Sequence, residues 1–245
     1  MKTLLKNIAK KVKGSVPLRQ QFRDFDDKFW EIYDRCAPFT MTSPERMYAL
    51  YQSTTYISTA GICGDIVECG VWRGGSSMMV AETLVGLGDT TRTLFLYDTY
   101  EGMTEPTEAD KDHAGNSAQV LLDTSEKKAE TVWNMVGLEE VKKNLAATGY
   151  PLSKIQFIKG KVEETIPGHI PDTISLLRLD TDWYESTRHE LIHLYPLLEK
   201  NGVLIIDDYG YWQGARKAVD EYFADQNIPI LLNRIDTTGR IATKI

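Results

Sequence analysis

Cysteine is scarce in this chain of 245 residues, which contains only Cys36, Cys63 and Cys69. No two of them form a Cys-x-x-Cys pair, and no cysteine and histidine residues have the spacing of a zinc site. The scarcity excludes a disulfide-stabilised scaffold, and the odd number predicts free thiols in a reducing compartment. We therefore expect a cytoplasmic protein. No continuous apolar stretch follows the N-terminal lysines, so we expect no secretory signal.

The chain also lacks long apolar runs and an excess of positive charge. No apolar run reaches the roughly 18 residues that a membrane span needs, so we expect no integral membrane segment. The net charge is −7 and the pI is about 5.2, whereas a general grip on nucleic acid needs a basic surface. A hydrophobic content of 42% and a charged content of 26% are typical of a globular domain and exclude a mainly disordered chain.

The N-terminal part of the chain is expected to be helical. Residues 1–13 combine five lysines with apolar residues at helical spacing. Such a basic amphipathic helix can lie on a membrane surface, and the plainer alternative is a helix docked on its own domain or on a partner subunit. Aromatic residues at helical spacing predict a second helix over 21–36, which Pro38 ends. We treat residues 1–38 as an N-terminal helical extension.

Beyond this extension, short apolar runs alternate with helical patterns. Ser43 and Pro44 predict the start of a helix that runs to about residue 59. Strands are expected over 66–69, 93–97, 155–158, 173–179 and 202–206, helices over 76–85, 128–148, 186–198 and 215–226, and a final antiparallel pair over 229–233 and 240–244. The alternation indicates an α/β domain, residues 39–245, with a mainly parallel sheet. The long polar loop over about 102–119 is predicted to be a lid over a site.

A glycine-rich turn follows the first predicted strand. Gly70, Gly74 and Gly75 stand between strand and helix, and Ser76 and Ser77 can cap that helix. Glycines let a ligand approach the backbone, and a helix N-terminus offers free N–H groups. The spacing is not GxGxxG, so the dinucleotide fingerprint is absent. The alternative is a turn that only joins strand to helix.

Asp98 ends the second predicted strand. In nucleotide-binding α/β folds an acid at this place binds both hydroxyls of a ribose. Because the pyrophosphate fingerprint is missing, the pattern favours an adenosine-type cofactor, and S-adenosylmethionine fits with its ribose, adenine and amino acid end. A simple helix cap is the alternative role for Asp98.

Four aspartates end two later strands. Asp180 and Asp182 follow one strand, and Asp207 and Asp208 follow the next. Carboxylates that lie together repel one another unless a cation joins them, and hard oxygen ligands favour Mg²⁺, with Ca²⁺ or Mn²⁺ as alternatives. A further acid beside such a metal can serve as a general base. Solvated loop acids or helix caps are the alternative interpretation.

Three histidines were weighed as additional site residues. His189 and His193 lie one turn apart on a predicted helix, which suits a metal pair on spacing alone. Surface or packing roles explain them better, because the aspartates already account for a metal. His113 lies in the predicted lid, where a contact with substrate is the alternative to a surface role.

Five motifs occur in an order that resembles the macrocin O-methyltransferase family. They are DIVECGVWRGGSS (65–77), YDTYEGM (97–103), KGKVEETIP (159–167), LRLDTDWYEST (177–187) and IIDDYG (205–210). The family comprises Mg²⁺-dependent and S-adenosylmethionine-dependent enzymes that methylate sugar hydroxyls on macrolide and aminocoumarin antibiotics. The resemblance implies a Rossmann-like class I methyltransferase fold with a mainly parallel seven-stranded sheet, an antiparallel C-terminal pair and N-terminal helices.

The resemblance also implies roles for individual residues. The cofactor would be bound by Met41, Thr42, Glu68, Gly70, Ser76, Asp98, Tyr100, Gly160, Lys161 and Val162. Asp180, Asp207 and Asp208 would bind Mg²⁺, and Asp182 would be the general base that takes the proton of the acceptor hydroxyl. The acceptor would be a sugar or glycoside, with Trp212 and Gln213 on the wall opposite the lid. A homo-oligomer is expected, because family members are often dimers or larger.

One residue departs from the family pattern, and other functions stay open. Trp183 follows the expected base where the family often has an aliphatic residue, which predicts a changed acceptor pocket or adenine edge. A related Mg²⁺-dependent enzyme that methylates a catechol or another vicinal diol is the first alternative. A catalytically inactive scaffold that binds the cofactor is the second. A nicotinamide oxidoreductase is disfavoured by the missing GxGxxG.

Overall fold

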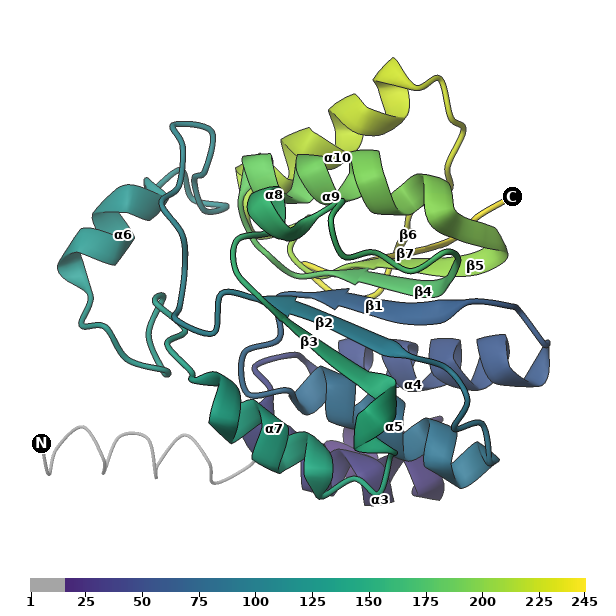
Figure 1. Ribbon diagram of the computed structural model, residues 1–245. Helices are drawn as coiled ribbons and strands as arrows, with labels where there is room; N and C mark the ends of the chain where they lie inside the picture. The colour runs from purple at the N-terminus through teal and green to yellow at the C-terminus, as the bar shows by residue number, and fades with distance from the viewer. Residues whose placement is uncertain (1–15) are drawn as a thin grey trace, which may run out of the picture.

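The computed structural model describes residues 16–245 and contains a seven-stranded sheet between two layers of helices (Figure 1). The strands lie in the order β3-β2-β1-β4-β5-β7-β6. Their bounds are β1 Asp65–Cys69, β2 Leu94–Asp98, β3 Ile155–Lys159, β4 Ile174–Leu179, β5 Leu198–Ile206, β6 Asn233–Arg234 and β7 Arg240–Thr243. Strands β1 to β5 are parallel, whereas β7 is antiparallel to both β5 and β6. The predicted fold class, with its antiparallel C-terminal pair, is confirmed.

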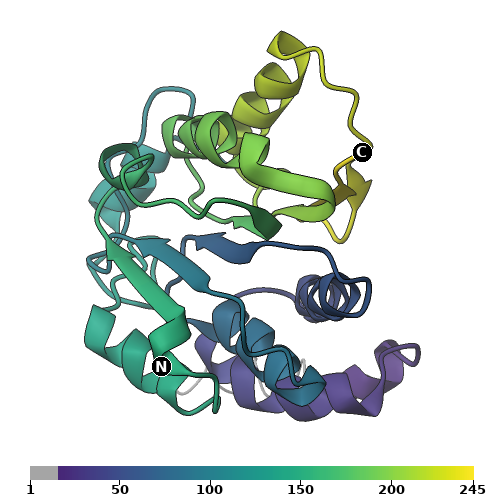
Figure 2. The same cartoon turned by 45° about the vertical axis from the view of Figure 1, so that its right-hand side comes forward.

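The helices form one layer on each face of the sheet (Figure 2). One layer holds α3 (Asp27–Cys36), α4 (Pro44–Thr59), α5 (Gly75–Leu87) and α7 (Leu138–Ala146). The other holds α8 (Val162–Thr165), α9 (Tyr184–Leu194) and α10 (Gln213–Asp225). None of the helices formed by residues 16–245 is both long and apolar enough to cross a bilayer.

Alternation along the central strands fills both layers with apolar side chains. On β1, Ile66 packs in the cluster with α3, α4 and α5, whereas its neighbour Val67 packs in the cluster with α9 and α10. Successive side chains of a strand point to opposite faces, so a strand covered on both sides is apolar throughout. Burial of each such side chain contributes roughly 1.5–3 kcal/mol relative to exposure. The short apolar runs of the sequence are therefore the central strands.

The order of the strands also places a crevice. The chain runs outward from β1 through β2 to β3, and then returns to the other side of β1 to form β4 and β5. The helical connections diverge at such a reversal and leave a ligand-sized crevice beyond the carboxyl ends of the strands. The ends of β1, β2, β4 and β5 all open into this crevice.

Two predicted helices in the first layer are too long. The helix expected over 21–36 starts only at Asp27, because Asp26 is the N-cap and its side chain accepts a bond from Phe29 N at 2.8 Å. The separate short helix α2 (Leu18–Gln21) precedes it. The helix expected over 128–148 is reduced to α7, whose N-cap is Gly137. The basic helix expected over 1–13 lies outside the described residues.

Two further boundaries are wrong near the C-terminus. The helix expected over 186–198 ends at Leu194 and is followed by a 3-10 turn (Tyr195–Leu197), and Leu198 already belongs to β5. The strand expected over 229–233 consists only of β6, which pairs with β7 through two residues. In the first case, Pro196 ends the helical segment of α9 earlier than its apolar periodicity predicts.

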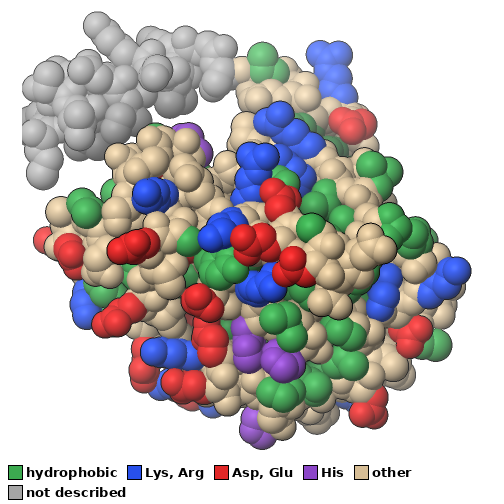
Figure 3. All heavy atoms as spheres, turned by 90° about the horizontal axis from the view of Figure 1, so that it is seen from above, with side chains coloured by type: hydrophobic (Ala, Val, Ile, Leu, Met, Phe, Trp, Pro, Cys, Tyr) green, Lys and Arg blue, Asp and Glu red, His purple; other side chains and the backbone are tan. Residues whose placement is uncertain are grey.

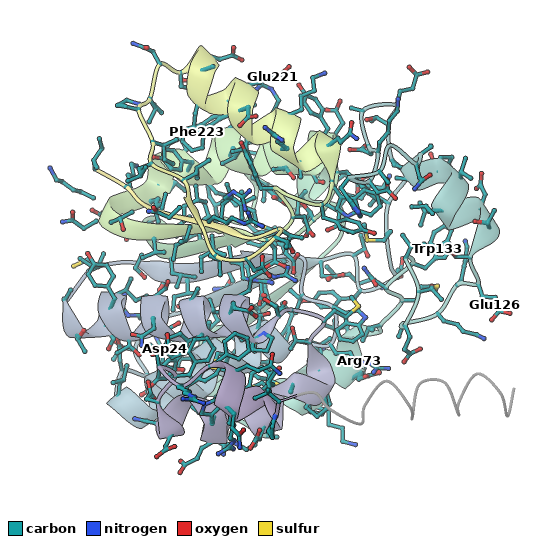
Figure 4. All side chains as sticks on the ribbon, turned by 180° about the vertical axis from the view of Figure 1, so that it is seen from behind. Asp24, Arg73, Glu126, Trp133, Glu221 and Phe223 are labelled. Atoms are coloured by element: carbon teal, nitrogen blue, oxygen red, sulfur yellow. The ribbon has the colours of Figure 1, made fainter. Side chains whose placement is uncertain are left out.

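The segment between β2 and α7 forms an insertion beside the sheet, where Figure 4 shows Trp133 and Glu126. It contains the predicted lid, but the end of that loop is helical and belongs to α6 (Ala118–Thr124). A small apolar cluster joins the insertion to the starts of α9 and α10; its buried members are Ala118, Leu122, Trp183, Trp212 and Ala215. The lid segment is thus packed onto the second helical layer.

Candidate functional site

A cavity of about 370 Å³ lies beyond the carboxyl ends of the central strands. Most of the predicted site residues line it: Met41, Thr42, Gly70, Ser76, Asp98, Gly160, Lys161, Val162, Asp180, Asp182, Asp207 and Asp208. Glu68 and Tyr100 do not line it, although both were expected at the cofactor. The structure thus brings predicted residues from six separate segments into one space whose size suits a small-molecule ligand.

Glu68 and Tyr100 lie behind the cavity wall. The Glu68 carboxylate is buried and accepts bonds from Ser77 Oγ and from Arg178 Nη1, the latter at 2.6 Å. The Tyr100 hydroxyl donates to the carbonyl oxygen of Leu96 at 3.0 Å. Glu68 therefore supports Arg178, which lines the cavity, whereas the Tyr100 hydroxyl is bonded to its own strand β2.

Asp98 organises the glycine turn. One carboxylate oxygen accepts bonds from Val71 N at 2.7 Å and Trp72 N at 3.1 Å, and the other accepts from Tyr100 N at 2.7 Å. Burial raises the pKa of Asp98, and these backbone bonds oppose the rise. The partners of Asp98 are thus the N–H groups of the turn after β1 and of its own loop, at the wall of the cavity.

Gly70 allows the end of β1 to lie in direct contact with the end of β4. Its φ is +83°, and a Cβ at this position would lie 2.0 Å from the carbonyl oxygen of Asp180. Only glycine combines this backbone conformation with so close an approach. The end of β1 therefore lies directly against the end of β4, and the glycine turn lies directly against the aspartates.

Arg178 is a buried cation in the cavity wall that the sequence interpretation missed. Its side chain pairs with Glu68, with Asp180 at 2.8 Å and with Asp207 at 2.8 Å. These carboxylates hold the pKa of Arg178 above its usual value against the opposing effect of burial. The signal was present in the sequence, because an arginine interrupts the otherwise apolar run of β4. Buried charges need partners, so this residue pointed to acids on neighbouring strands.

Arg46 is a second cation that was missed. It lies in the first turn of α4, where Ser43 is the N-cap, and it pairs with Asp207 and with Asp236 at 3.0 Å. Asp236 belongs to the turn between β6 and β7 and also accepts a bond from Ser43 Oγ at 2.7 Å. Arg46 therefore ties the start of α4 and the C-terminal hairpin to the acidic side of the cavity.

The carboxylates of Asp180, Asp207 and Asp208 come together as predicted. Each offers an oxygen within 4.8 Å of the others, and this is the one such metal-compatible group among residues 16–245. Burial raises the pKa of both Asp180 and Asp208, and the neighbouring carboxylates raise it further. The acids thus repel one another, and a bound cation would relieve that repulsion.

Asp182 lies beside this group on the cavity wall. Its φ is +70°, in the left-handed region that few non-glycine residues adopt. Burial, with the charge of Asp180, raises the pKa of Asp182 to about 7. A carboxylate with such a pKa can accept a proton near neutral pH.

The three histidines do not join the aspartates. His189 Nε2 is 2.9 Å from the carbonyl oxygen of Ile166, and its ring packs against His193 with centroids 4.4 Å apart. The ring of His113 packs against Tyr211, which lines the cavity, with centroids 5.1 Å apart. The histidine pair therefore has a packing role, and His113 lies behind Tyr211 without lining the cavity itself.

Only one of the two residues expected on the acceptor wall lines the cavity. Trp212 lines the cavity, whereas Gln213 bonds the lid through the carbonyl oxygens of Lys111 and Asp112. Trp183 is 2% exposed and does not line the cavity. It packs edge-on against Trp212 and donates to the carbonyl oxygen of Thr104 at 3.1 Å. The large side chain thus supports the wall from behind rather than narrowing the pocket.

The arrangement combines two chemical environments in one cavity. One side offers backbone N–H groups, glycines and the half-buried Asp98, and the other offers four aspartates together with Arg46 and Arg178. On the outer surface seen in Figure 3, basic and acidic side chains are interspersed. The concentration of acids at the strand ends is therefore a property of the cavity.

Comparison with known proteins gives a consistent result. Residues 4–244 match the family model described as Macrocin-O-methyltransferase (TylF). The 8-demethyl-8-(2,3-dimethoxy-alpha-L-rhamnosyl)-tetracenomycin-C 4'-O-methyltransferase of Streptomyces olivaceus is 36% identical over 200 residues, which cover 82% of this chain and 73% of that protein. Demethyldecarbamoylnovobiocin O-methyltransferase of Streptomyces niveus is 32% identical, with the same coverage.

Solved structures show the same fold. The O-methyltransferase NovP superposes with a TM-score of 0.73 at 29% identity and covers 84% of this chain and 82% of its own. The calicheamicin methyltransferase CalS11 has a TM-score of 0.57 at 18% identity, with 94% of this chain and 98% of that chain covered. The second likeness concerns the fold alone.

Proposed function

This chain belongs to the macrocin-O-methyltransferase family, and we propose that it transfers a methyl group from S-adenosylmethionine to a sugar hydroxyl with the help of Mg²⁺. That it is an S-adenosylmethionine-dependent O-methyltransferase follows from the family. The sugar acceptor, the metal ion and the roles of single residues are the proposal. The observation that carries it is the meeting of the predicted cofactor residues and four aspartates in one cavity.

The aspartates fit a divalent cation. Asp180, Asp207 and Asp208 offer carboxylate oxygens close enough to share one ion, and such hard ligands are those that Mg²⁺ prefers. Arg178 and Arg46 pair only with Asp180 and Asp207 of the four aspartates, so Asp182 and Asp208 have no cation of their own and the pKa of each is raised. Asp180, Asp207 and Asp208 would hold the ion. When bound, Mg²⁺ would lower the pKa of the acceptor hydroxyl, and S-adenosylmethionine would supply the methyl group.

Asp182 is proposed as the general base. It reaches the cavity beside Asp208, and burial raises its pKa to about 7. The carboxylate would accept the proton of the acceptor hydroxyl as that oxygen attacks the methyl group. General bases of this kind contribute about 10²–10⁴-fold to the rate.

The cofactor side would act mainly by positioning. Asp98 holds the N–H groups of Val71 and Trp72 in the glycine turn, and Gly160 with Lys161 borders the same cavity. Correct placement of two reactants is itself a large part of catalysis in group transfer. Met41 and Thr42, from the segment before α4, would cover the cofactor and exclude water.

The names of the relatives support a sugar acceptor. One relative is a 4'-O-methyltransferase of a rhamnosyl-tetracenomycin, and another is a mycinamicin III 3''-O-methyltransferase, 30% identical over 200 residues. A catechol is the alternative acceptor, and the aromatic rings of Tyr211 and Trp212 on the cavity wall favour it in part. Both acceptors present two neighbouring oxygens.

A panel of acceptors separates these functions. Purified protein would be incubated with S-adenosylmethionine, Mg²⁺ and either deoxysugar glycosides, nucleotide sugars or catechols, and methylated products would be detected by mass spectrometry. We expect a sugar product that is lost when a chelator removes the metal. A catechol methylated with a higher kcat/KM than every sugar would contradict the sugar assignment, and no turnover with any diol would support an inactive scaffold.

The proposal also covers the location of the protein, its oligomeric state and its domain organisation. We place the protein in the cytoplasm as a homo-oligomer, with residues 1–38 as an N-terminal extension of the catalytic domain 39–245. Light scattering after size-exclusion chromatography measures the oligomeric state. A monomer at micromolar concentration would contradict that part of the proposal.

A further inference from the structure

Asp110, in the lid, forms a buried joint that the sequence motifs did not reveal. Its side chain has no exposed surface, although it carries a carboxylate. One oxygen accepts bonds from Thr107 N at 2.7 Å and Thr107 Oγ1 at 2.8 Å, and the other accepts from Tyr184 N at 2.8 Å. The backbone oxygen of Asp110 also accepts from Ala118 N, at the start of α6, at 2.9 Å. A single residue thus joins three segments.

The bond to Tyr184 replaces a missing helix cap. Tyr184 is the first residue of α9, and the N-cap residue Trp183 provides no side-chain bond to the free N–H groups. Helix N-termini favour a carboxylate both as an acceptor and through the helix dipole. Asp110 supplies that carboxylate from 74 positions away in the chain. The start of α9 is therefore completed only when the lid is in place.

The start of α10 is shaped around the same carboxylate. Gly214 is the second residue of α10, and a Cβ at this position would lie 1.9 Å from the Asp110 Oδ1 atom. Real Cβ contacts are never so short, so the glycine leaves the space that the carboxylate fills. Gln213, one residue earlier, donates its N–H to the carbonyl oxygen of Lys111 at 2.8 Å. Asp110 therefore lies at the meeting point of the lid, α9 and α10.

The two helices that meet here carry the acceptor side of the site. Asp182 lies two residues before α9, and Trp212 lies directly before α10. We propose that Asp110 is a positioning residue that fixes Asp182 and Trp212 relative to each other and so sets the productive pose of the acceptor. The inference rests on the proposed function. It assigns to the lid a fixed structural role in addition to covering the cavity.

The first test compares Asp110→Ala with Glu108→Ala. Glu108 is an exposed acid in the same turn and serves as the matched control for loss of one charge. For Asp110→Ala we expect kcat/KM for the acceptor to fall by about a hundredfold, the effect of a misplacement of about 1 Å. The dissociation constant of S-adenosylhomocysteine should stay within about twofold, because its predicted residues lie on the other side of the cavity. Glu108→Ala should leave both quantities unchanged.

A double-mutant cycle tests the contact between Asp110 and Gly214 by changing Gly214. Gly214→Ala should displace the Asp110 carboxylate and reduce acceptor kcat/KM in the same way. When Asp110 is already alanine, the added methyl group no longer meets an oxygen, and the remaining close neighbour is Tyr184 N at 3.1 Å, a contact that a small shift relieves. The double variant should therefore be no worse than Asp110→Ala alone, whereas independent sites would multiply their effects. Asp110→Asn keeps an oxygen for Tyr184 N and should lie between wild type and Asp110→Ala.

Hydrogen exchange at the Tyr184 amide provides a readout that does not need turnover. It should accelerate in Asp110→Ala and in Gly214→Ala but not in Glu108→Ala. If wild type methylates no sugar, the proposed function fails, and the joint itself is then decided by this exchange. Unchanged acceptor kinetics in Asp110→Ala, unchanged Tyr184 exchange, or an equal loss of S-adenosylhomocysteine affinity would each overturn the inference.

Discussion

The two sides of the cavity neutralise buried charge in different ways. On the cofactor side, Asp98 is surrounded by backbone N–H groups of the glycine turn, so its charge is matched by dipoles. On the acceptor side, Asp180 and Asp207 face the guanidinium groups of Arg178 and Arg46, and two further aspartates add charge without a cation of their own. Burial raises the pKa of Asp98 as well, but no neighbouring carboxylate adds to that rise, whereas the second side has more carboxylates than cations.

This difference assigns a ligand to each side. A side made of backbone dipoles and glycines suits a cofactor held by shape and by hydrogen bonds. A side with surplus carboxylates suits a cation, because burial penalises their charged form, as the raised pKa of Asp208 indicates. Gly70 keeps the two sides in contact, so the methyl donor and the metal would be neighbours. Substitutions on one side should therefore leave ligand binding on the other side unchanged.

Asp182→Asn should have the largest effect on activity. The amide keeps the shape of the side chain but cannot accept the proton, so kcat should fall by about 10²–10⁴-fold. The affinity for S-adenosylhomocysteine, measured by calorimetry, should stay within about twofold of wild type. A variant that keeps more than a tenth of its kcat would remove Asp182 from the role of base.

Asp208→Ala should break the acceptor side without disturbing the cofactor side. Loss of a direct ligand should weaken Mg²⁺ or Mn²⁺ binding by about a hundredfold, because even partners behind a ligand contribute tenfold to a hundredfold. Titration of the metal into wild type and variant measures this change. Equal metal affinity in both proteins would show that the cation binds elsewhere. Asp225→Ala, at the end of α10, is the control for loss of one acid.

Asp98→Ala should break the cofactor side instead. Its loss leaves the N–H groups of Val71 and Trp72 without their acceptor, and a hydrogen bond to a charged group contributes about 1.5–3 kcal/mol. The affinity for S-adenosylhomocysteine should therefore fall by about tenfold or more, while metal affinity stays unchanged. A parallel loss of both affinities would mean that the two sides do not act separately.

His193→Gln should have the smallest effect and sharpens the assignment of the metal. His193 packs against His189 on α9, and burial lowers the pKa of its ring. Replacement of a residue outside the aspartate group should change metal affinity by less than about twofold. A larger loss, measured in the same titration, would return the histidine pair to the metal site.

Much of the fold followed from local patterns, and the errors have a common cause. Most central strands are apolar runs bounded by glycine or aspartate and could be placed within one or two residues, as β1 and β3 show, whereas β5 begins at Leu198 and not at residue 202 as expected. The helix expected over 128–148 has the right composition but belongs in part to the insertion, where packing against α9 and α10 replaces helical bonds. Periodicity does not report such tertiary contacts.

Site residues that belong to a local sequence motif could be predicted, whereas those that depend on a partner distant in sequence could not. The aspartates at the ends of β4 and β5 were placed correctly in one cavity. Arg46 and Asp110 were missed, because their partners Asp207 and Tyr184 are distant in sequence and no local pattern marks the pairs. Arg178 was missed as well, although a charge inside a buried strand signals a partner by itself.

The most direct test of the account is calorimetric titration of S-adenosylhomocysteine, then Mg²⁺, then a sugar acceptor, into wild type and Asp208→Ala. The account predicts that both proteins bind S-adenosylhomocysteine, that only wild type binds Mg²⁺ tightly, and that the sugar binds only when Mg²⁺ is present. If S-adenosylhomocysteine binds normally but Mg²⁺ neither binds nor changes sugar affinity in wild type, the aspartates are not a metal site and the account of the acceptor side is wrong.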